Sequence, residues 1–397
     1  MPEDSSEMAD MHLEAVERIR PVLEECAAEA EAQRALPDAA YDAMLGEGLF
    51  RMLTPRAFGG LERHPVEALR AIEAVARIDS AAGWCLNISH AVGSFACWLP
   101  KEGGEEVYAR GGDTLVAGGF FPPAPSVPVE GGWRVTARCR FASGCHRAQW
   151  FLVPIVEVDD ESSKYDPHTQ DPPHLGCFIP RDEVELVDNW HTGGMRGTFS
   201  AEVVVDDVFV PDRRILHVKR RDERPPAYTG PLYGTAPWFG IHGEAAVSLG
   251  IAGAAIDEFV ELALRKTPGL VRVPLHDREM AQHHVARATA LVDAGRVFLN
   301  DAISEAYSDA EREGWFSDSS RLRCQLAACF AAESSAEAVD LVCEAAGTSA
   351  SRLAYGFERH HRDIHFLAKH ADKSYARYED VGKMMFGIPP AYFALEI

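Results

Sequence analysis

The chain has 397 residues, 47% of them hydrophobic, so it can bury a large core and is long enough for two or three domains. Its formal net charge of −22 at pH 7 argues against nucleic acid and anionic membrane surfaces as partners. The first ten residues do not look like a signal peptide, and no apolar stretch approaches membrane-spanning length. The nine cysteines are an odd number without a Cys-x-x-Cys pair, which predicts reduced thiols in a cytoplasmic protein.

The first third of the chain, residues 1–110, is predicted to be an N-terminal α-helical domain. Residues 13–31 are rich in Glu and Ala, and residues 37–49 begin with a proline in the first turn of a helix. A break at residues 55–60 (Pro-Arg-Ala-Phe-Gly-Gly) is followed by helical patterns over residues 66–77 and 81–99.

Residues 111–220 are predicted to form a central β domain, because glycine, proline and β-branched runs alternate there. An alternating run, residues 133–138, follows a Gly131-Gly132 turn. Residues 159–173 look like a loop insertion that could tune access of a substrate. From residue 221 to 397 we expect a C-terminal helical bundle domain, reached by a charged, proline-bearing connection at residues 218–226. It contains a stretch rich in small residues (240–253) and two long amphipathic segments (281–302 and 321–346).

A hydroxyl lies on a tight connection between two predicted strands. Residues 140–150 read Arg-Phe-Ala-Ser-Gly-Cys-His-Arg-Ala-Gln-Trp, and this places Ser143 at the end of a strand, where a small side chain can meet the edge of a flat ligand. Ser-Gly between strands is more often plain turn chemistry, so this segment alone is a weak signal.

Three features in this order resemble the acyl-CoA dehydrogenase superfamily. They are the Pro-x-x-Phe-Gly-Gly break with Ile-Asp-Ser-Ala-Ala-Gly-Trp at residues 78–84, the segment Asp-Asn-Trp-His-Thr-Gly-Gly-Met-Arg-Gly-Thr-Phe-Ser at 188–200, and Arg265 with Arg362-Asp363. The resemblance implies an α+β fold with an N-terminal helical domain, a central β-barrel or sandwich domain and a C-terminal four-helix bundle. It also implies a homotetramer that binds flavin between the barrel and the bundles.

Within the superfamily the chain is similar to the reduced-flavin-dependent, two-component monooxygenases. Arg362-Asp363 is followed by no Glu-Gly-Thr stretch, and His370 falls about where a dehydrogenase has its catalytic Glu. Phe-Ala-Ser-Gly-Cys-His at residues 141–146 is the monooxygenase wording of the flavin-edge strand. The resemblance implies an oxygenase component that hydroxylates an aromatic or natural-product-like small molecule with reduced flavin and O2, through a C4a-hydroperoxyflavin.

The resemblance also implies roles for individual residues. Ser143 would accept a hydrogen bond from flavin N5–H, His370 would orient or protonate the peroxide, and His90 would serve as the base that ionises a phenol. The residues expected to bind the cofactor are Phe141, Ser143, Gly144, Trp190, Arg265, Gly347 and Thr348. The plainer interpretations are a turn residue for Ser143, a buried core residue for His90, a surface charge for Arg265 and a helix C-cap for Gly347.

Two departures from the relatives and two absences complete this interpretation. Phe199 and Cys139 stand where monooxygenase relatives often have Gly and Trp, so flavin orientation or pocket size could differ. The chain has no Gly-x-Gly-x-x-Gly nicotinamide motif, which predicts that a separate reductase supplies reduced FMN or FAD. His361-x-x-x-His365 has metal-ligand spacing but lacks a supporting Glu, and we expect no metal there.

Two alternatives stay open at this point. The first is an acyl-CoA dehydrogenase or oxidase that binds FAD tightly and uses a Glu such as Glu244 as its base. The second is a flavin-binding or scaffold protein that has kept the fold and lost the chemistry.

Overall fold

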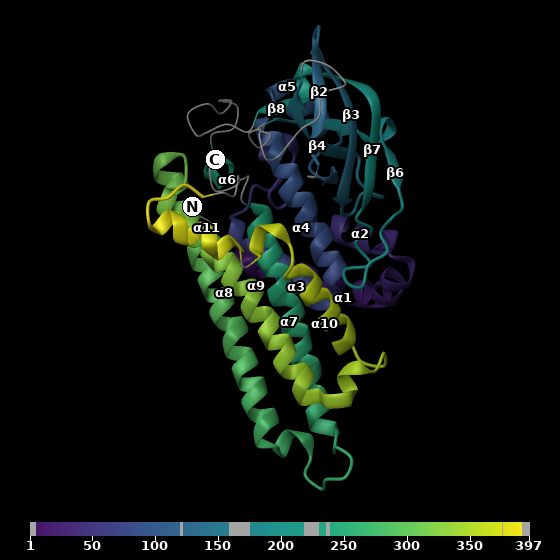
Figure 1. Ribbon diagram of the computed structural model, residues 1–397, viewed down its shortest axis with the longest axis vertical. Coiled ribbons are helices and arrows are strands. Elements are labelled where there is room, and N and C mark those ends of the chain that lie inside the picture. Colours follow the sequence, from purple (N-terminus) through teal and green to yellow (C-terminus); the bar gives the residue numbers. More distant parts are fainter. Residues whose placement is uncertain are drawn as a thin grey trace.

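The computed structural model describes residues 5–119, 122–158, 175–217, 230–235, 239–374 and 376–390. The expected loop insertion at 159–173 and the connection at 218–226 lie outside these residues. Figure 1 shows the sheet at one end of the molecule, with three long helices extending away from it. None of the helices within these ranges is long and apolar enough to cross a membrane.

The N-terminal part is helical. Its elements are α1 (Ser5–Gln33), α2 (Asp38–Gly46), η1 (Leu49–Arg51), η2 (Arg56–Phe58), α3 (Pro65–Ile78), α4 (Ser80–Ser94), η3 (Phe95–Trp98) and α5 (Lys101–Val107). Helix α3 begins with a proline, which suits the first helical position because its missing N–H would have no intrahelical partner. Asp79 separates α3 from α4, and its carboxylate caps α4 by accepting from the Ala82 N–H at 2.7 Å.

The strands form one mixed sheet in the order β6-β7-β3-β2-β4-β5-β8, with β1 paired to β4. Their bounds are β1 (Val116–Gly118), β2 (Ala124–Val129), β3 (Gly132–Ala142), β4 (Trp150–Glu157), β5 (Leu175–Pro180), β6 (Glu185–Val187), β7 (Ala201–Pro211) and β8 (Ile215–His217), with η4 (Arg181–Glu183) and η5 (Asp212–Arg214) between strands. Strands β3 and β7 are the longest antiparallel pair, and side chains of β3 alternate between buried and exposed along most of its length.

The C-terminal part is helical again. Its elements are α6 (Pro231–Thr235), α7 (Phe239–Arg265), η8 (Leu275–Asp277), α8 (Glu279–Glu313), α9 (Asp318–Ala346), η9 (Gly347–Ser351), α10 (Phe357–Leu367), η10 (Ala371–Lys373) and α11 (Ala376–Met385). Helices α7, α8 and α9 run side by side, and α7 also packs against α3 and α4 of the N-terminal part.

Small residues let α7 approach the N-terminal helices closely. A Cβ added at Gly243 would lie 1.7 Å from Asn87 Oδ1, and one added at Gly250 would lie 2.5 Å from the Glu73 carbonyl oxygen. Side chains at these positions would therefore push α7 away from α3 and α4.

Buried apolar side chains form two clusters. One lies inside the sheet region, and the other is continuous from α1 through α4 into the C-terminal helices. The helical parts thus share one core, against which the end of the sheet is placed. The predicted α+β fold, with helices before and after a central sheet, is confirmed.

Candidate functional site

Ser143 lies directly after β3, on the connection to β4. A register shift of the β3–β7 ladder between Cys139 and Ala142 marks a bulge, and within it Phe141 has φ = 66°. Such a backbone is uncommon for a bulky residue, and bulges that redirect side chains are frequent beside active sites. Gly144 has φ = 70°, and its N–H donates to the Thr198 carbonyl oxygen at 2.8 Å. The connection is therefore bonded to the segment that precedes β7.

Four polar side chains, one of them Ser143, form a continuous row of hydrogen bonds. The indole Nε1–H of Trp84 on α4 donates to Ser143 Oγ at 2.9 Å, and Ser143 Oγ lies 2.6 Å from Ser200 Oγ. Ser200 Oγ lies 2.7 Å from Thr198 Oγ1, which donates to the Met195 carbonyl oxygen at 2.9 Å. All four side chains are buried. The row joins α4, the β3–β4 connection and the loop before β7.

Helix α10 fixes the loop that carries this row. The Asp363 carboxylate accepts from the Met195 N–H at 2.6 Å and from Ser80 Oγ at 2.5 Å. Arg362 donates through Nη1 to the Gly193 carbonyl oxygen. The Arg362-Asp363 pair that contributed to the sequence resemblance is thus a clamp on residues 193–195.

Three aromatic rings form a wall next to Ser143. Trp190 is buried and makes edge-to-face contacts with Phe141 and Phe366, at centroid distances of 6.1 and 5.7 Å. Its Nε1–H donates to the Met195 carbonyl oxygen at 3.1 Å. Phe141, in contrast, is 62% exposed, which is unusual for a large apolar ring. An exposed aromatic ring beside a buried one suits contact with a flat, partly apolar ligand.

His370 belongs to an ionic cluster around Trp84, in which Glu244 and Lys373 are buried and His370 is partly exposed. Its Nδ1 lies 3.0 Å from Glu244 Oε2, and Lys373 Nζ donates to that same oxygen at 3.2 Å. The ring of His370 meets Trp84 edge-on at 5.6 Å, and Lys373 Nζ lies 5.3 Å from the centre of the Trp84 ring. Trp84 therefore connects the two predicted catalytic residues, Ser143 and His370, although neither contacts the other in the described hydrogen bonds.

The ionic cluster sets the protonation of its members. Burial lowers the pKa of His370, but the charge of Glu244 and its hydrogen bond outweigh burial, so the pKa is raised above the ordinary 6.5. For Glu244, burial raises the pKa, but His370 and Lys373 together reverse this and the pKa is lowered below 4.5. An ionised Glu244 thus faces an imidazole that keeps its second proton to a higher pH than an ordinary histidine.

His90 lies apart from this cluster. It is buried on α4, where burial lowers its pKa to about 4 and a backbone hydrogen bond to Leu49 opposes the shift only partly. The structure does not bring His90 into contact with Ser143 or His370 in the described interactions. Its imidazole is neutral at pH 7, as a base must be before it accepts a proton.

The sequence interpretation did not include His242, a second buried histidine, on α7. Burial lowers its pKa to about 3, and the described residues give it no hydrogen-bond partner. It is two residues from Glu244 and adjacent to Gly243, which contacts Asn87 of α4. A histidine within a run of small residues reads as a core residue in the sequence, so no pattern would have singled it out.

The remaining predicted cofactor residues gather at the opposite end of the bundle. Arg265 is the last residue of α7 and is exposed, while Gly347 and Thr348 follow the end of α9. Lys266 holds these ends together by donating to the Ala346 carbonyl oxygen at 2.7 Å and to Ser349 Oγ at 2.8 Å. Figure 1 shows the connection from α7 to α8 at the end of the bundle far from the sheet.

Helix geometry gives the scale of this separation. Arg265 is 21 residues beyond Glu244 on α7, which corresponds to about 30 Å at 1.5 Å per residue. One side chain cannot span that distance. Arg265, Gly347 and Thr348 therefore do not complete the site around Ser143 within a single chain.

The two departures at Phe199 and Cys139 have structural explanations. Phe199 has φ = 43°, a backbone that glycine adopts without strain, and its ring packs edge-on against His146 at 5.5 Å. Cys139 is fully buried in the sheet core, and a Cβ added at Gly119 would lie 2.6 Å from the Cys139 Cβ. This close packing therefore requires residue 119 to lack a side chain.

Two other places on the surface offer polar groups but give less support for a bound ligand. Asp340 of α9 supplies the carboxylate that the His361-x-x-x-His365 motif lacks in sequence, with Oδ1 2.7 Å from His365 Nε2 and 3.4 Å from His361 Nε2. The group is half-exposed, and its hydrogen bonds account for its arrangement.

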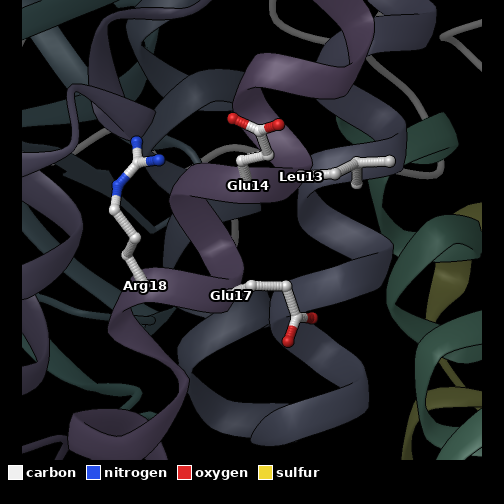
Figure 2. Close-up of a pocket in the computed structure, with 4 residues that line it drawn as sticks. All are labelled: Leu13, Glu14, Glu17 and Arg18. Atoms are coloured by element: carbon white, nitrogen blue, oxygen red, sulfur yellow. The ribbon is translucent and has the colours of Figure 1, made fainter.

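A shallow hollow on α1 is lined by Leu13, Glu14, Glu17 and Arg18 (Figure 2). Arg18 is already paired with Glu47 at 2.7 Å, and Glu17 is paired with Arg20 at 2.6 Å, so this lining offers no unpaired cation to an anionic ligand such as a flavin phosphate.

The residues around Ser143 fit a flavin ring. A flavin needs an apolar face, and the exposed Phe141 beside the buried Trp190 offers one. Its N5 edge needs a polar group in a water-poor place, and Ser143 Oγ is such a group, being buried at a strand end. The Nδ1 of His370 faces Glu244, so its Nε2 is the nitrogen left to meet a ligand.

The chain is similar to known flavoproteins along its whole length. The acyl-CoA dehydrogenase N-terminal domain family matches residues 3–110, and the C-terminal domain family matches residues 242–375. Indole-3-acetate monooxygenase from Pseudomonas putida is 28% identical over 363 residues, covering 91% of this chain and 90% of that one. The oxygenase subunit HsaA of a flavin-dependent monooxygenase from Rhodococcus jostii is 27% identical, covering 95% and 98%.

Solved structures agree with these relatives. XiaF from Streptomyces sp., solved with FADH2 and glycerol, has a TM-score of 0.90 at 25% identity and covers 98% of both chains. The 3-HSA hydroxylase from Rhodococcus sp. RHA1 has a TM-score of 0.87 at 26% identity, covering 96% of this chain and 98% of that one. The predicted family is confirmed: the chain belongs to the acyl-CoA dehydrogenase superfamily, in its group of flavin-dependent monooxygenase oxygenase components.

Proposed function

We propose that this chain is the oxygenase component of a two-component monooxygenase that hydroxylates a small aromatic molecule with reduced FMN or FAD and O2. The observation that carries the proposal is the buried Ser143 hydroxyl, placed at a strand end beside an aromatic wall and linked through Trp84 to His370. When bound, reduced flavin supplies the electrons that activate oxygen. The protein residues bind and orient it, exclude water and manage protons.

Ser143 and His370 have complementary tasks in this proposal. Ser143 Oγ would accept a hydrogen bond from the N5–H of a bound reduced flavin and would hold that proton in place. His370, with its pKa raised by Glu244, would hold a proton on Nε2 to a higher pH than an ordinary histidine and would act as the general acid. Glu244 fixes the ring through Nδ1, much as a carboxylate orients a catalytic histidine elsewhere.

An aromatic substrate is supported by the names of the relatives of this chain. Relatives of this chain include an indole-3-acetate monooxygenase and a resorcinol hydroxylase, both of which act on aromatic rings by name. His90 and His242 are buried on neighbouring helices, with pKa values lowered by burial to about 4 and about 3. A neutral imidazole can accept a hydrogen bond from a phenol that binds next to it, but pKa values this low make both histidines weak bases, so the role of His90 in ionising a phenol stays a prediction.

The acyl-CoA dehydrogenase alternative has less support. It requires a carboxylate that removes a proton from the substrate, for which Glu244 is the candidate. Glu244 is instead bonded to His370 and Lys373, and its lowered pKa makes it a weak base. Its charge is used to hold two neighbouring cations.

The partners and the assembly follow from the same proposal. The relatives are called oxygenase subunits or components, which supports a separate flavin reductase as partner. Apolar side chains of Leu264, Leu270 and Leu353 are largely exposed around the far end of the bundle. Their exposure, next to Arg265, supports a homotetramer in which this end covers the flavin of a neighbouring chain. All nine cysteines are free thiols, which suits a cytoplasmic protein.

The test uses purified chain, anaerobically reduced FMN or FAD, and a panel of phenols and indole acids. After mixing with ¹⁸O2, the proposal expects one ¹⁸O atom in a hydroxylated product. An acyl-CoA-dependent reduction of dye by protein with firmly bound FAD would instead establish the dehydrogenase. A melting temperature that no flavin changes would favour the scaffold.

A further inference from the structure

The hydroxyl row behind Ser143 has a direction that the structure fixes from one end. Thr198 Oγ1 lies 2.9 Å from the carbonyl oxygen of Met195, and a carbonyl oxygen can only accept. The Thr198 hydroxyl proton therefore points to Met195. Because each hydroxyl has a single proton, Thr198 can only accept from Ser200, at 2.7 Å.

The same reasoning passes to Ser143. The Ser200 proton is used toward Thr198, so the 2.6 Å contact between Ser143 and Ser200 is satisfied only if Ser143 donates. The indole of Trp84 donates to Ser143 Oγ from the other side. Ser143 is left with no proton to offer and with one free lone pair.

We propose that Ser200 and Thr198 are positioning residues that keep Ser143 a pure hydrogen-bond acceptor and thereby make the site select reduced over oxidised flavin. The inference depends on the proposed function, in which Ser143 meets the N5 edge. Reduced flavin carries a proton on N5 and can donate to Ser143. Oxidised flavin has only a lone pair on N5, which would face the lone pair of Ser143.

Reversing the row is possible but costs a hydrogen bond. For Ser143 to donate to oxidised flavin, either Thr198 must turn away from Met195 or two hydroxyl oxygens must face each other without a proton between them. The loss of one ordinary hydrogen bond corresponds to about fivefold in an equilibrium constant. Phe141, Met195 and Phe199, which flank the row in sequence, all have positive φ. Such backbone conformations persist only where the surrounding structure determines them, so the segments that carry the row are held in place by their packing.

The experiment measures the dissociation constants of FAD and FMN in their oxidised and reduced forms, for the wild type and for Ser200→Ala. The reduced forms are measured anaerobically by ultrafiltration. Without Ser200, the Ser143 proton is free to turn toward N5. We expect the ratio of oxidised to reduced dissociation constants to fall about fivefold. For a two-electron couple, a fivefold fall in this ratio corresponds to a fall of about 20 mV in the midpoint potential of the bound flavin.

Further variants separate the row from general damage. Thr198→Val removes the same proton path while keeping the side-chain shape, and should lower the ratio as Ser200→Ala does. Thr198→Ser keeps the hydroxyl and should restore the wild-type ratio. Ser335→Ala, which removes a buried hydroxyl that donates to the Ala331 carbonyl oxygen within α9, should leave the ratio unchanged.

Two results would overturn the inference, and they are distinguishable. If the wild type binds reduced flavin and hydroxylates, but Ser200→Ala and Thr198→Val keep the wild-type ratio, the row does not select the redox state. Equal weakening of both flavin forms counts as an unchanged ratio. If the wild type binds neither flavin form, the proposed function fails and this inference fails with it.

Discussion

The two ends of the C-terminal bundle differ in what they bury. At the end next to the sheet, Lys373 has no exposed side-chain surface, and it pairs with a buried Glu244 beside Trp84. At the far end, Arg265 is exposed among exposed leucines and has no described ion pair. The first end thus pairs its charged groups within one chain, whereas the second presents a cation without a described ion pair and an apolar surface. From this difference we propose that one chain supplies the reactive half of a site and a neighbouring chain supplies the anion-binding half.

The near end should be costly to disturb. Lys373→Met leaves the buried carboxylate of Glu244 with only the partly exposed His370 as its partner. We expect the free energy of unfolding to fall by about 3 kcal/mol, as when one partner of a buried ion pair is removed. Denaturant titration measures it. Adding Glu244→Gln to Lys373→Met should recover part of the lost free energy of unfolding. A Lys373→Met variant as stable as the wild type would show that the cluster is solvated.

The far end should behave in the opposite way. Arg265→Ala should leave the free energy of unfolding within about 0.5 kcal/mol of the wild type, because the side chain is exposed. It should weaken reduced flavin binding by about 1.5–3 kcal/mol, the value of hydrogen bonds from a guanidinium to a phosphate. Anaerobic flavin titration checks this, with the exposed Arg272→Ala as the matched control. Equal affinity of both variants would remove Arg265 from the site.

Ser143→Ala tests whether the near end controls the chemistry. Removing the acceptor leaves N5–H buried without a partner, which costs about 1–3 kcal/mol. We expect roughly five- to hundredfold more hydrogen peroxide released per hydroxylated product. Peroxide and product are measured together, and Ser335→Ala serves as the control. An unchanged ratio of peroxide to product would make Ser143 a turn residue only.

The smallest effect concerns pH. The raised pKa of His370 stabilises the fold fully below pH 6.5 and loses that contribution as pH rises through the folded value. The lowered pKa of Glu244 contributes above pH 4.5 and is lost as pH falls through its folded value. The stability lost in His370→Gln should thus be greatest between pH 4.5 and 6.5 and shrink above.

The size of this pH effect is limited by solvent. The His370 side chain is 39% exposed, so we expect a difference of only about 0.5–1 kcal/mol. Asp372, 3.8 Å from His370 Nδ1, and Lys373 face the same ring and act in opposite directions. Thermal melting of the wild type and His370→Gln from pH 4 to 9 measures the difference in stability. A difference that stays constant across that range would contradict a stabilising pair of His370 and Glu244.

The fold could be predicted from the sequence because the fold depends on local sequence patterns. Helical periodicity, the alternation in β3 and the proline at the start of α3 are local signals, and the family resemblance orders them. The bulge at Phe141 was out of reach, because its positive φ is imposed by pairing with β7.

The site was only partly predictable. Ser143 and His370 stood out through their motifs, but Trp84, Glu244 and Lys373 join them only in three dimensions, across α4, α7 and η10. Glu244 was considered only as the base of a different enzyme, because a sequence does not show that its charge is used by two cations. The separation of Arg265 from Ser143 likewise depends on the direction of α7.

The most direct test of a site divided between chains is complementation. Ser143→Ala and Arg265→Ala subunits, each defective alone, are co-expressed and purified as mixed oligomers. If one chain provides Ser143 and its neighbour provides Arg265, about a quarter of the sites carry both native residues, as random mixing in a symmetric oligomer requires. We expect tight binding of reduced flavin and coupled hydroxylation at about a quarter of the wild-type level. Activity no higher than the average of the two parent variants would contradict the divided site.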